Sequence, residues 1–63
     1  MFLELLPLPA MALSGLRRKR IKNLADVAGL SEEELDNING VGRQSLAIIK
    51  AEMKRRGMTF RSQ

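Results

Sequence analysis

Two glycines around a single valine, Gly40-Val41-Gly42, restrict the fold of this chain more than any other feature of its sequence. Helix-forming sequence lies on both sides of them, and glycine lets the backbone turn sharply enough to join two helices over very few residues. We therefore predict a tight helical hairpin at these three residues, with Val41 pointing into the core.

The helix before the hairpin has a complete start signal. Ser31 is followed three residues later by Glu34, which is the pattern of a capping box, and Leu30 and Leu35 stand at the positions of the hydrophobic staple around it. We expect this helix to carry Leu35 and Ile38 on one side and to stop at Asn39-Gly40.

The helix after the hairpin should run from about Arg43 to Arg56. The spacing of its apolar residues predicts a buried stripe of Leu46, Ile49 and Met53, with Ser45 small enough for close helix contact. Gly57 can take the left-handed position after the helix, and Met58 can then contact Met53, as the Schellman motif requires.

Two shorter helices are predicted before the hairpin. Asn23 can cap a one-turn helix that Gly29 ends, and another helix can begin near Pro9 or Ala10. In that earlier helix Leu13 and Leu16 share a face, while Gly15 weakens it by about 1 kcal/mol relative to alanine.

The sequence therefore predicts an all-α fold, a compact bundle of four to five short helices with an extended N-terminal arm, because no segment alternates with period two. Pro7 and Pro9 favour an arm over residues 1–9 that packs onto the domain. The helical domain is expected over residues 10–60, and a tail over residues 61–63.

Composition argues against catalysis. The chain has 63 residues and contains neither cysteine nor histidine, so the commonest metal ligands, nucleophiles and general base are missing. We expect no enzyme activity, no cofactor and no metal site. The apolar N-terminal stretch is interrupted by prolines and is shorter than the roughly 20 residues that span a bilayer, so no membrane association is expected.

Positive charge is concentrated in two parts of the sequence. One basic run covers residues 17–22, an acidic stretch lies between Asp26 and Asp36, and the second half is basic again; the net charge is +4. Basic clusters favour a polyanion such as nucleic acid, although each cluster alone is also compatible with an ordinary solvated helix face.

The glycine hairpin has the chemistry of a phosphate site. Backbone amides around Gly42 and Arg43 would point outward at a helix N-terminus, and glycine lets a phosphate oxygen approach without a Cβ in the way. Arg43 and Gln44 would add donors. The alternative is that Gly-Val-Gly simply makes a tight turn between helices.

Spacing around the hairpin resembles the helix-hairpin-helix motif, with serine where that family often has alanine: Leu35-x-x-Ile38-x-Gly40-Val41-Gly42-x-x-Ser45-Leu46-x-x-Ile49. A narrower resemblance, covering about residues 6–60, is to the C-terminal domain of the bacterial RNA polymerase alpha subunit. It rests on Ile21-x-x-Leu24-x-Asp26-Val27-x-x-x-Ser31-Glu32-x-Glu34-Leu35, Gly42-x-x-Ser45-Leu46-x-x-Ile49-Lys50 and Arg56-Gly57-Met58, with Leu6 and Leu8 resembling the Leu-x-Leu pair before the first helix. The resemblance implies a small helical bundle that binds the DNA minor groove and touches activators and sigma factor.

The DNA-contacting residues of that family are only partly present. Its hairpin glycine and serine match Gly42 and Ser45. Its first-helix arginine falls at Met11, and the glutamate near that arginine falls at Ile48. Ser14 and Gly40 stand where that family has asparagines, and Gln44 stands where it has a lysine. Two apolar residues thus stand in place of a charged pair, which favours a drier contact surface at Met11 and Ile48, unless Met11 folds onto the core.

Two functional hypotheses follow. The first is a non-enzymatic DNA-binding module of transcription, cytoplasmic and nucleoid-associated, that contacts the backbone and an A·T-rich minor groove. Its expected contact residues are Gly40, Gly42, Arg43, Gln44, Ser45, Arg17, Arg18, Lys19 and Lys50. The second is a protein-interaction module of the transcription machinery that uses Met11 and Ile48, with Phe2 and Leu3 as further apolar contacts. Its expected partners are RNA polymerase, sigma factor, a transcription regulator or, weakly, a second copy of the same protein.

Overall fold

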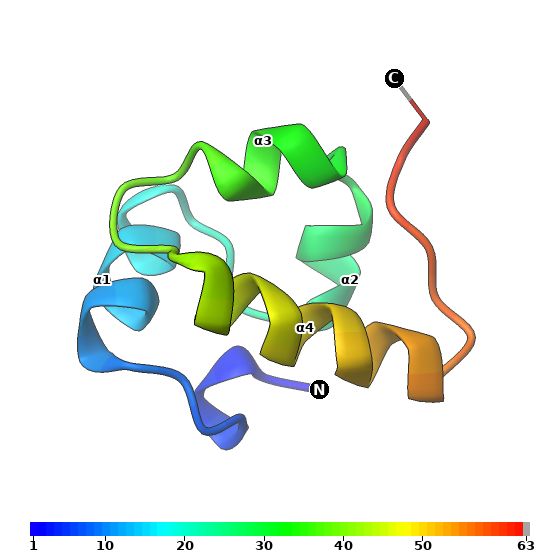
Figure 1. Cartoon of the computed structure of the whole chain (residues 1–63), viewed down its shortest axis with the longest axis horizontal. Helices are drawn as coiled ribbons and strands as arrows, with labels where there is room; N and C mark the ends of the chain where they lie inside the picture. Colours follow the sequence, from blue (N-terminus) through cyan, green and yellow to red (C-terminus); the bar gives the residue numbers. More distant parts are fainter. Residues whose placement is uncertain (63) are drawn as a thin grey trace.

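The chain folds into a short 3-10 helix followed by four α-helices, in a computed structural model that describes residues 1–62. The elements are η1 (Leu3–Leu5), α1 (Ala10–Arg18), α2 (Leu24–Ala28), α3 (Glu32–Asp36) and α4 (Arg43–Arg55). The predicted all-α fold is confirmed, and residues 1–62 contain no β-strand. Figure 1 shows α4 running across the molecule, with α3 on one side of it and the N-terminal arm on the other.

Both five-residue helices begin with a full capping box. At α3 the Ser31 hydroxyl accepts a hydrogen bond from the Glu34 amide at 3.1 Å, and the Glu34 carboxylate accepts one from the Ser31 amide at 2.8 Å. This confirms the predicted cap. At α2 the predicted cap Asn23 is joined by Asp26, whose carboxylate accepts a hydrogen bond from the Asn23 amide at 3.2 Å. These local bonds let very short helices form.

Helix α3 is shorter than predicted. It ends at Asp36, with Asn37 as its C-cap, so Ile38 lies beyond the helix although its side chain is buried. The Ile38 amide donates to the Leu35 carbonyl at 3.2 Å, and the Val41 amide donates to the Ile38 carbonyl at 3.1 Å. The backbone therefore leaves the helix early and enters the hairpin through tight turns.

Helix α4 ends as the sequence predicts. The Met58 amide donates to the Met53 carbonyl at 2.8 Å, the Gly57 amide donates to the Lys54 carbonyl at 3.1 Å, and Gly57 has φ +69°. These bonds are the Schellman motif. Ile49 and Met53 are buried as expected, while Leu46 is only half-buried at the edge of the core.

Helix α1 ends in the same motif without a glycine. The Arg20 amide donates to the Arg17 carbonyl at 2.9 Å, and the Ile21 amide donates to the Leu16 carbonyl at 2.9 Å. Arg20 takes the left-handed position, with φ +61°, where glycine is usual. The buried pair of Leu16 and Ile21 supplies the apolar contact of the motif.

The N-terminal arm contributes three leucines to the core. Leu3, Leu6 and Leu8 are buried with the helix residues, and η1 adds a helical turn to an arm that was expected to be extended. The Leu3 amide donates to the Lys22 carbonyl at 2.9 Å, and the Leu24 amide donates to the Met1 carbonyl at 3.0 Å. These bonds fix the arm beside the segment that leads into α2.

The last residues described return to the body of the molecule. The Arg61 amide donates to the Leu30 carbonyl at 2.8 Å, and its guanidinium pairs with Glu34. Figure 1 shows this C-terminal segment passing α2 toward α3. Of the tail predicted at residues 61–63, Gln63 lies outside the described residues.

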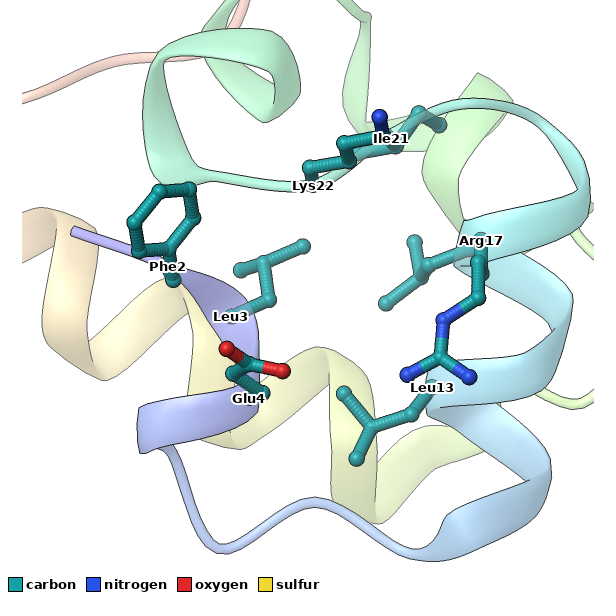
Figure 2. Close-up of a pocket in the computed structure, with 8 residues that line it drawn as sticks. Phe2, Leu3, Glu4, Leu13, Arg17, Ile21 and Lys22 are labelled. Atoms are coloured by element: carbon teal, nitrogen blue, oxygen red, sulfur yellow. The ribbon is translucent and has the colours of Figure 1, made fainter.

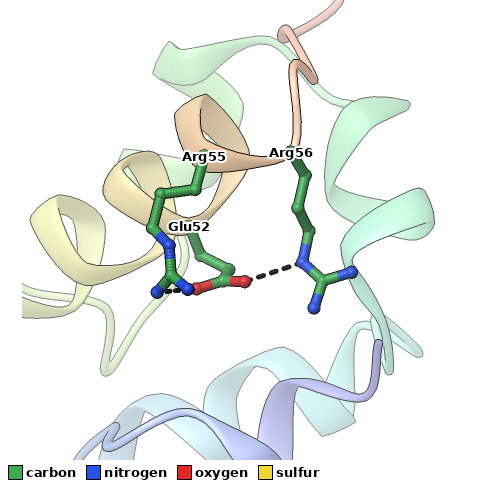
Figure 3. A network of polar contacts seen from close by, with 3 residues as sticks. All are labelled: Glu52, Arg55 and Arg56. Carbon is green, nitrogen blue, oxygen red and sulfur yellow. Dashed lines mark hydrogen bonds and ion pairs between the residues drawn. The ribbon is translucent and has the colours of Figure 1, made fainter.

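One carboxylate is buried within α4. Glu52 pairs with Arg56 at 2.7 Å and with Arg55 at 3.1 Å, and Figure 3 shows the carboxylate held between the two guanidinium groups. The hydrogen bond from Arg56, together with the positive charges of Arg55 and Arg56, keeps the pKa of Glu52 below its ordinary value, against the opposing effect of desolvation. The sequence pattern did not indicate that this position faces inward.

Candidate nucleic-acid interface

The N-terminus of α4 is left open by the fold. Gly42 is the N-cap residue and has no side chain to cap the helix, and the first helical bond runs from the Leu46 amide to the Gly42 carbonyl at 2.9 Å. The amides of Arg43, Gln44 and Ser45 have no acceptor among residues 1–62. The two five-residue helices are capped while the longest helix is not, so its end presents unpaired donors and the positive end of the helix dipole.

Gly40 is a glycine because of α1. Its φ is +96°, and a Cβ atom on it would lie 2.9 Å from the carbonyl carbon of Met11 and 3.6 Å from the amide of Ala12. The hairpin loop therefore rests directly on the first turn of α1. This contact explains Gly40 without any ligand.

Gly15 is required by the same packing from the other side. A Cβ atom there would lie 3.1 Å from the carbonyl carbon of Asn39 and 3.4 Å from the Ile38 side chain. Gly15 lowers the helix propensity of α1, but its missing Cβ is what allows the hairpin loop to approach the helix. Sequence reasoning missed Asn39 and Gly15 as a contact, because only the tertiary structure brings them together.

Gly42 differs from both of these glycines. Its φ is −95°, and a Cβ atom on it would meet no atom of the protein within 4 Å. Neither backbone conformation nor internal packing therefore calls for glycine here. The position that a Cβ would occupy is open space at the N-cap of α4.

Ion pairs divide the basic residues into two classes. Lys50 pairs with Glu32 at 3.0 Å, and Arg55, Arg56 and Arg61 also have carboxylate partners. Within residues 1–62 no ion pair involves the remaining cations, which are Arg17, Arg18, Lys19, Arg20, Lys22, Arg43 and Lys54. The second basic cluster of the sequence is thus largely neutralised, while the run at the end of α1 and just after it is not.

The basic run separates onto two sides of α1. Arg18 and Lys19 share a depression with Gly15, Asn37 and Asn39, at the entry to the hairpin. Arg17 faces the other way and lines a cavity against the arm (Figure 2). Only Arg18 and Lys19 of the three predicted contact residues therefore lie beside the hairpin loop.

The other predicted contact residues also differ in availability. Arg43 and Gln44 are exposed in the first turn of α4. Ser45 is buried, so its side chain serves packing, and only its amide belongs to the open helix end. Lys50 lies two turns farther along α4 and is held by Glu32 on α3.

The apolar contact candidates have different surroundings. Phe2 is exposed, whereas Leu3 is buried in the core. The Met11 side chain is 73% exposed, so it does not fold onto the core, although its carbonyl touches Gly40. Ile48 is half-buried and packs against the core. Met11 is therefore the free apolar side chain next to the hairpin.

Metal sites and membrane spans each need a particular arrangement of residues. Among residues 1–62 no group of three or more acidic side chains is gathered in a way that could hold a metal ion. Within that same part of the sequence, no helix has the length and apolar character needed to cross a bilayer.

The chain matches the model of a known protein family. The family model that describes the C-terminal domain of the alpha chain of bacterial RNA polymerase matches residues 1–55, which include the arm, the first three α-helices, the hairpin and α4. A comparison with curated proteins finds no match.

Proposed function

Since this protein belongs to the family of the C-terminal domain of the bacterial RNA polymerase alpha subunit, we propose that it is a DNA-binding module of transcription that holds the phosphate backbone at its helical hairpin. Its work would be binding rather than catalysis. A module of this kind would be found with the nucleoid, near RNA polymerase, sigma factor or a transcription regulator.

The observation that carries the proposal is the open space at Gly42. A glycine with no internal role stands at the uncapped N-terminus of α4, where the amides of Arg43 and Gln44 lack acceptors among the described residues. A phosphate oxygen accepts hydrogen bonds from such amides and is favoured there by the helix dipole. The Arg43 side chain, exposed and outside every ion pair of residues 1–62, supplies a positive charge beside it.

The charge of the neighbouring surface supports a backbone contact. Arg18 and Lys19 have no ion-pair partner among the described residues and lie beside the loop residues Asn37 and Asn39. Each phosphate that such cations neutralise releases counterions, so the affinity should fall steeply as salt is added. Backbone contacts position a protein on DNA but carry no sequence information directly, so little sequence preference is expected from the hairpin itself.

The test is an NMR titration of ¹⁵N-labelled protein with a short A·T-rich duplex, at low and then physiological salt. We expect shifts of the Gly42, Arg43 and Gln44 amides, with smaller shifts at Arg18 and Lys19, all fading as salt rises. Arg43→Glu should abolish them. Lys54→Glu is the matched control, because it changes the net charge equally at the opposite end of α4.

The absence of shifts at low salt would contradict the proposal. Equal losses in the Arg43 and Lys54 variants would also contradict it, since they would indicate attraction by net charge alone.

Exposure of Met11 favours a second candidate function. A free, flexible apolar side chain beside the hairpin suits a protein contact. In this alternative the module binds a transcription protein, or weakly a second copy of itself, through Met11 with Ile48 at its edge. Sedimentation equilibrium of the wild type and of Met11→Glu tests self-association. A strictly monomeric wild type at millimolar concentration would exclude self-association.

A further inference from the structure

A cavity of about 430 Å³ lies between the N-terminal arm and α1, on the side of α1 that faces away from the hairpin. Leu3, Leu13, Leu16 and Ile21 line it with apolar side chains. Figure 2 shows Leu3, Leu13 and Ile21 around a common space. Its volume is within the range of about 300–1,000 Å³ that ligand sites occupy.

The edge of this cavity carries exposed charged side chains that have no partner among residues 1–62. Within residues 1–62 the side chains of Arg17, Lys22 and Glu4 form no hydrogen bond and no ion pair. Figure 2 shows the Arg17 guanidinium and the Glu4 carboxylate facing one another across the opening. Because the two groups do not pair with each other, both are available to a partner at the opening.

Phe2 adds an exposed aromatic ring to the same edge. Its side chain is 57% exposed, while its backbone is fixed by a bridge to Asn23. Large exposed aromatic rings on a fixed backbone are typical of contact surfaces, because they bury much area and lose little conformational entropy on binding.

We infer that this cavity binds an acidic, amphipathic segment of a protein partner, whose large apolar side chain enters the leucine-lined space while a carboxylate pairs with Arg17. The charges at the edge of the cavity favour an acidic partner. Arg17 and Lys22 outnumber Glu4 at the edge, and Arg18, Lys19 and Arg20 follow Arg17 in sequence, so the nearby potential is positive. Arginine suits the pairing because its guanidinium binds a carboxylate through two parallel hydrogen bonds.

Nucleic acid fits this cavity poorly, because phosphates would gain nothing from its apolar floor. Helix α1 separates the cavity from the hairpin: Leu13, Leu16 and Arg17 face one side, and Gly15, Arg18 and Lys19 face the other. A partner in the cavity would therefore leave the hairpin free. The domain could hold DNA and an acidic segment at once, on opposite sides of one helix.

The probe is a short synthetic peptide with leucine and phenylalanine on one helical face and glutamate on the other. It is titrated into the whole ¹⁵N-labelled protein without DNA, so that the result does not depend on the proposed hairpin contact. A matched peptide with lysine in place of each glutamate is the control. We expect saturable shifts at Leu3, Leu13, Leu16 and Arg17 with the acidic peptide only.

Three variants sharpen the test. Arg17→Glu should weaken peptide binding about tenfold, the loss expected for a charge-assisted pair. Phe2→Ala should weaken it roughly fivefold without changing any charge, because it removes an aromatic contact. Lys54→Glu, which alters net charge as Arg17→Glu does but lies outside the cavity, should leave peptide binding unchanged. Far-ultraviolet circular dichroism confirms that each variant is folded.

Several results would overturn the inference. These are equal binding of the lysine peptide, shifts centred elsewhere (for instance around Phe60), equal weakening by Lys54→Glu and Arg17→Glu, or no shifts at millimolar peptide. A further titration with DNA already bound should give the same peptide affinity within about twofold, as expected for uncoupled sites. Competition between DNA and peptide would contradict two separate surfaces.

Discussion

Gly40 lies against the carbonyl group of Met11, so closely that a Cβ on the glycine would stand 2.9 Å from the carbonyl carbon. The hairpin is therefore positioned by α1 as well as by the two helices that it joins. Met11, whose side chain is exposed beside the hairpin, is thus also the residue whose backbone supports the loop.

Alanine at the two hairpin glycines should affect different properties: stability at Gly40 and DNA affinity at Gly42. Gly40→Ala should lower the free energy of unfolding by about 2 kcal/mol or more, since its left-handed φ and its contact with Met11 both exclude a Cβ. Gly42→Ala should cost at most about 1 kcal/mol, but weaken DNA binding about tenfold. Urea unfolding and DNA titration separate the two effects. A destabilised Gly42→Ala with normal DNA affinity would mean that Gly42 is structural.

Alanine at Gly15 should destabilise the domain although alanine favours helices. Helix propensity alone predicts a gain of about 1 kcal/mol. The approach of the Asn39 backbone leaves no room for the methyl group, so we expect a net loss instead. Thermal unfolding of Gly15→Ala gives the sign directly, and a raised melting temperature would show that the loop moves away at little cost.

Arg20 offers a stabilising substitution. It occupies a left-handed conformation at the end of α1, with φ +61°, which costs a side-chain-bearing residue about 1–2 kcal/mol. Arg20→Gly removes that strain but adds freedom to the unfolded state, so we expect a net gain of up to about 1 kcal/mol. Arg20→Ala, which keeps the Cβ and removes the charge, is the control and should show no such gain in urea unfolding.

Restoring a cation at Met11 should strengthen DNA binding. The Met11 side chain is exposed beside the hairpin, where arginine could reach the negative potential of a narrow minor groove. Met11→Arg should raise affinity for an A·T-rich duplex about tenfold at low salt, and increase the salt slope by about 0.9 for each added phosphate contact. Met11→Gln controls for polarity. Unchanged affinity in Met11→Arg would place this side chain outside the DNA contact.

Acid should destabilise the fold through two glutamates. The hydrogen bond from the Ser31 amide, with the contribution of Arg61, lowers the pKa of Glu34, and Arg56 lowers that of Glu52. A carboxyl whose pKa is lowered by folding stabilises the folded state above its ordinary pKa of about 4.3, and this contribution is lost as the pH falls through the folded value. Urea unfolding from pH 7 to pH 3 should show the decline. Glu34→Gln and Glu52→Gln should each reduce its size, and an unchanged profile in both would exclude these groups as its cause.

Local sequence signals predicted the helix ends well. The Ser31–Glu34 box, the Asn23 cap and the Gly57 motif each depend on residues within a few positions of one another, so the sequence contains nearly all of their information. The predicted end of α3 is too late, because apolar Ile38 continues the helical spacing although its backbone does not.

The features of the candidate site that could not be predicted from the sequence depend on tertiary contacts. The contact of Gly15 with Asn39 joins residues far apart in sequence, and so does the pairing of Lys50 with Glu32. The division of the basic run between two sides of α1 depends on where the loop and the arm pack. Sequence shows how many cations there are, but only the fold shows which of them are free.

The arm has a consequence for how the molecule opens. Leu3, Leu6 and Leu8 complete the core, and burial of each contributes about 1.5–3 kcal/mol, a sum comparable with the whole stability of many small domains. The first residues therefore cannot detach while the helices stay folded. Hydrogen exchange at the Leu3 amide, which donates to Lys22, should be as slow as at amides in the middle of α4, and the protein from arm to α4 should unfold as one cooperative unit.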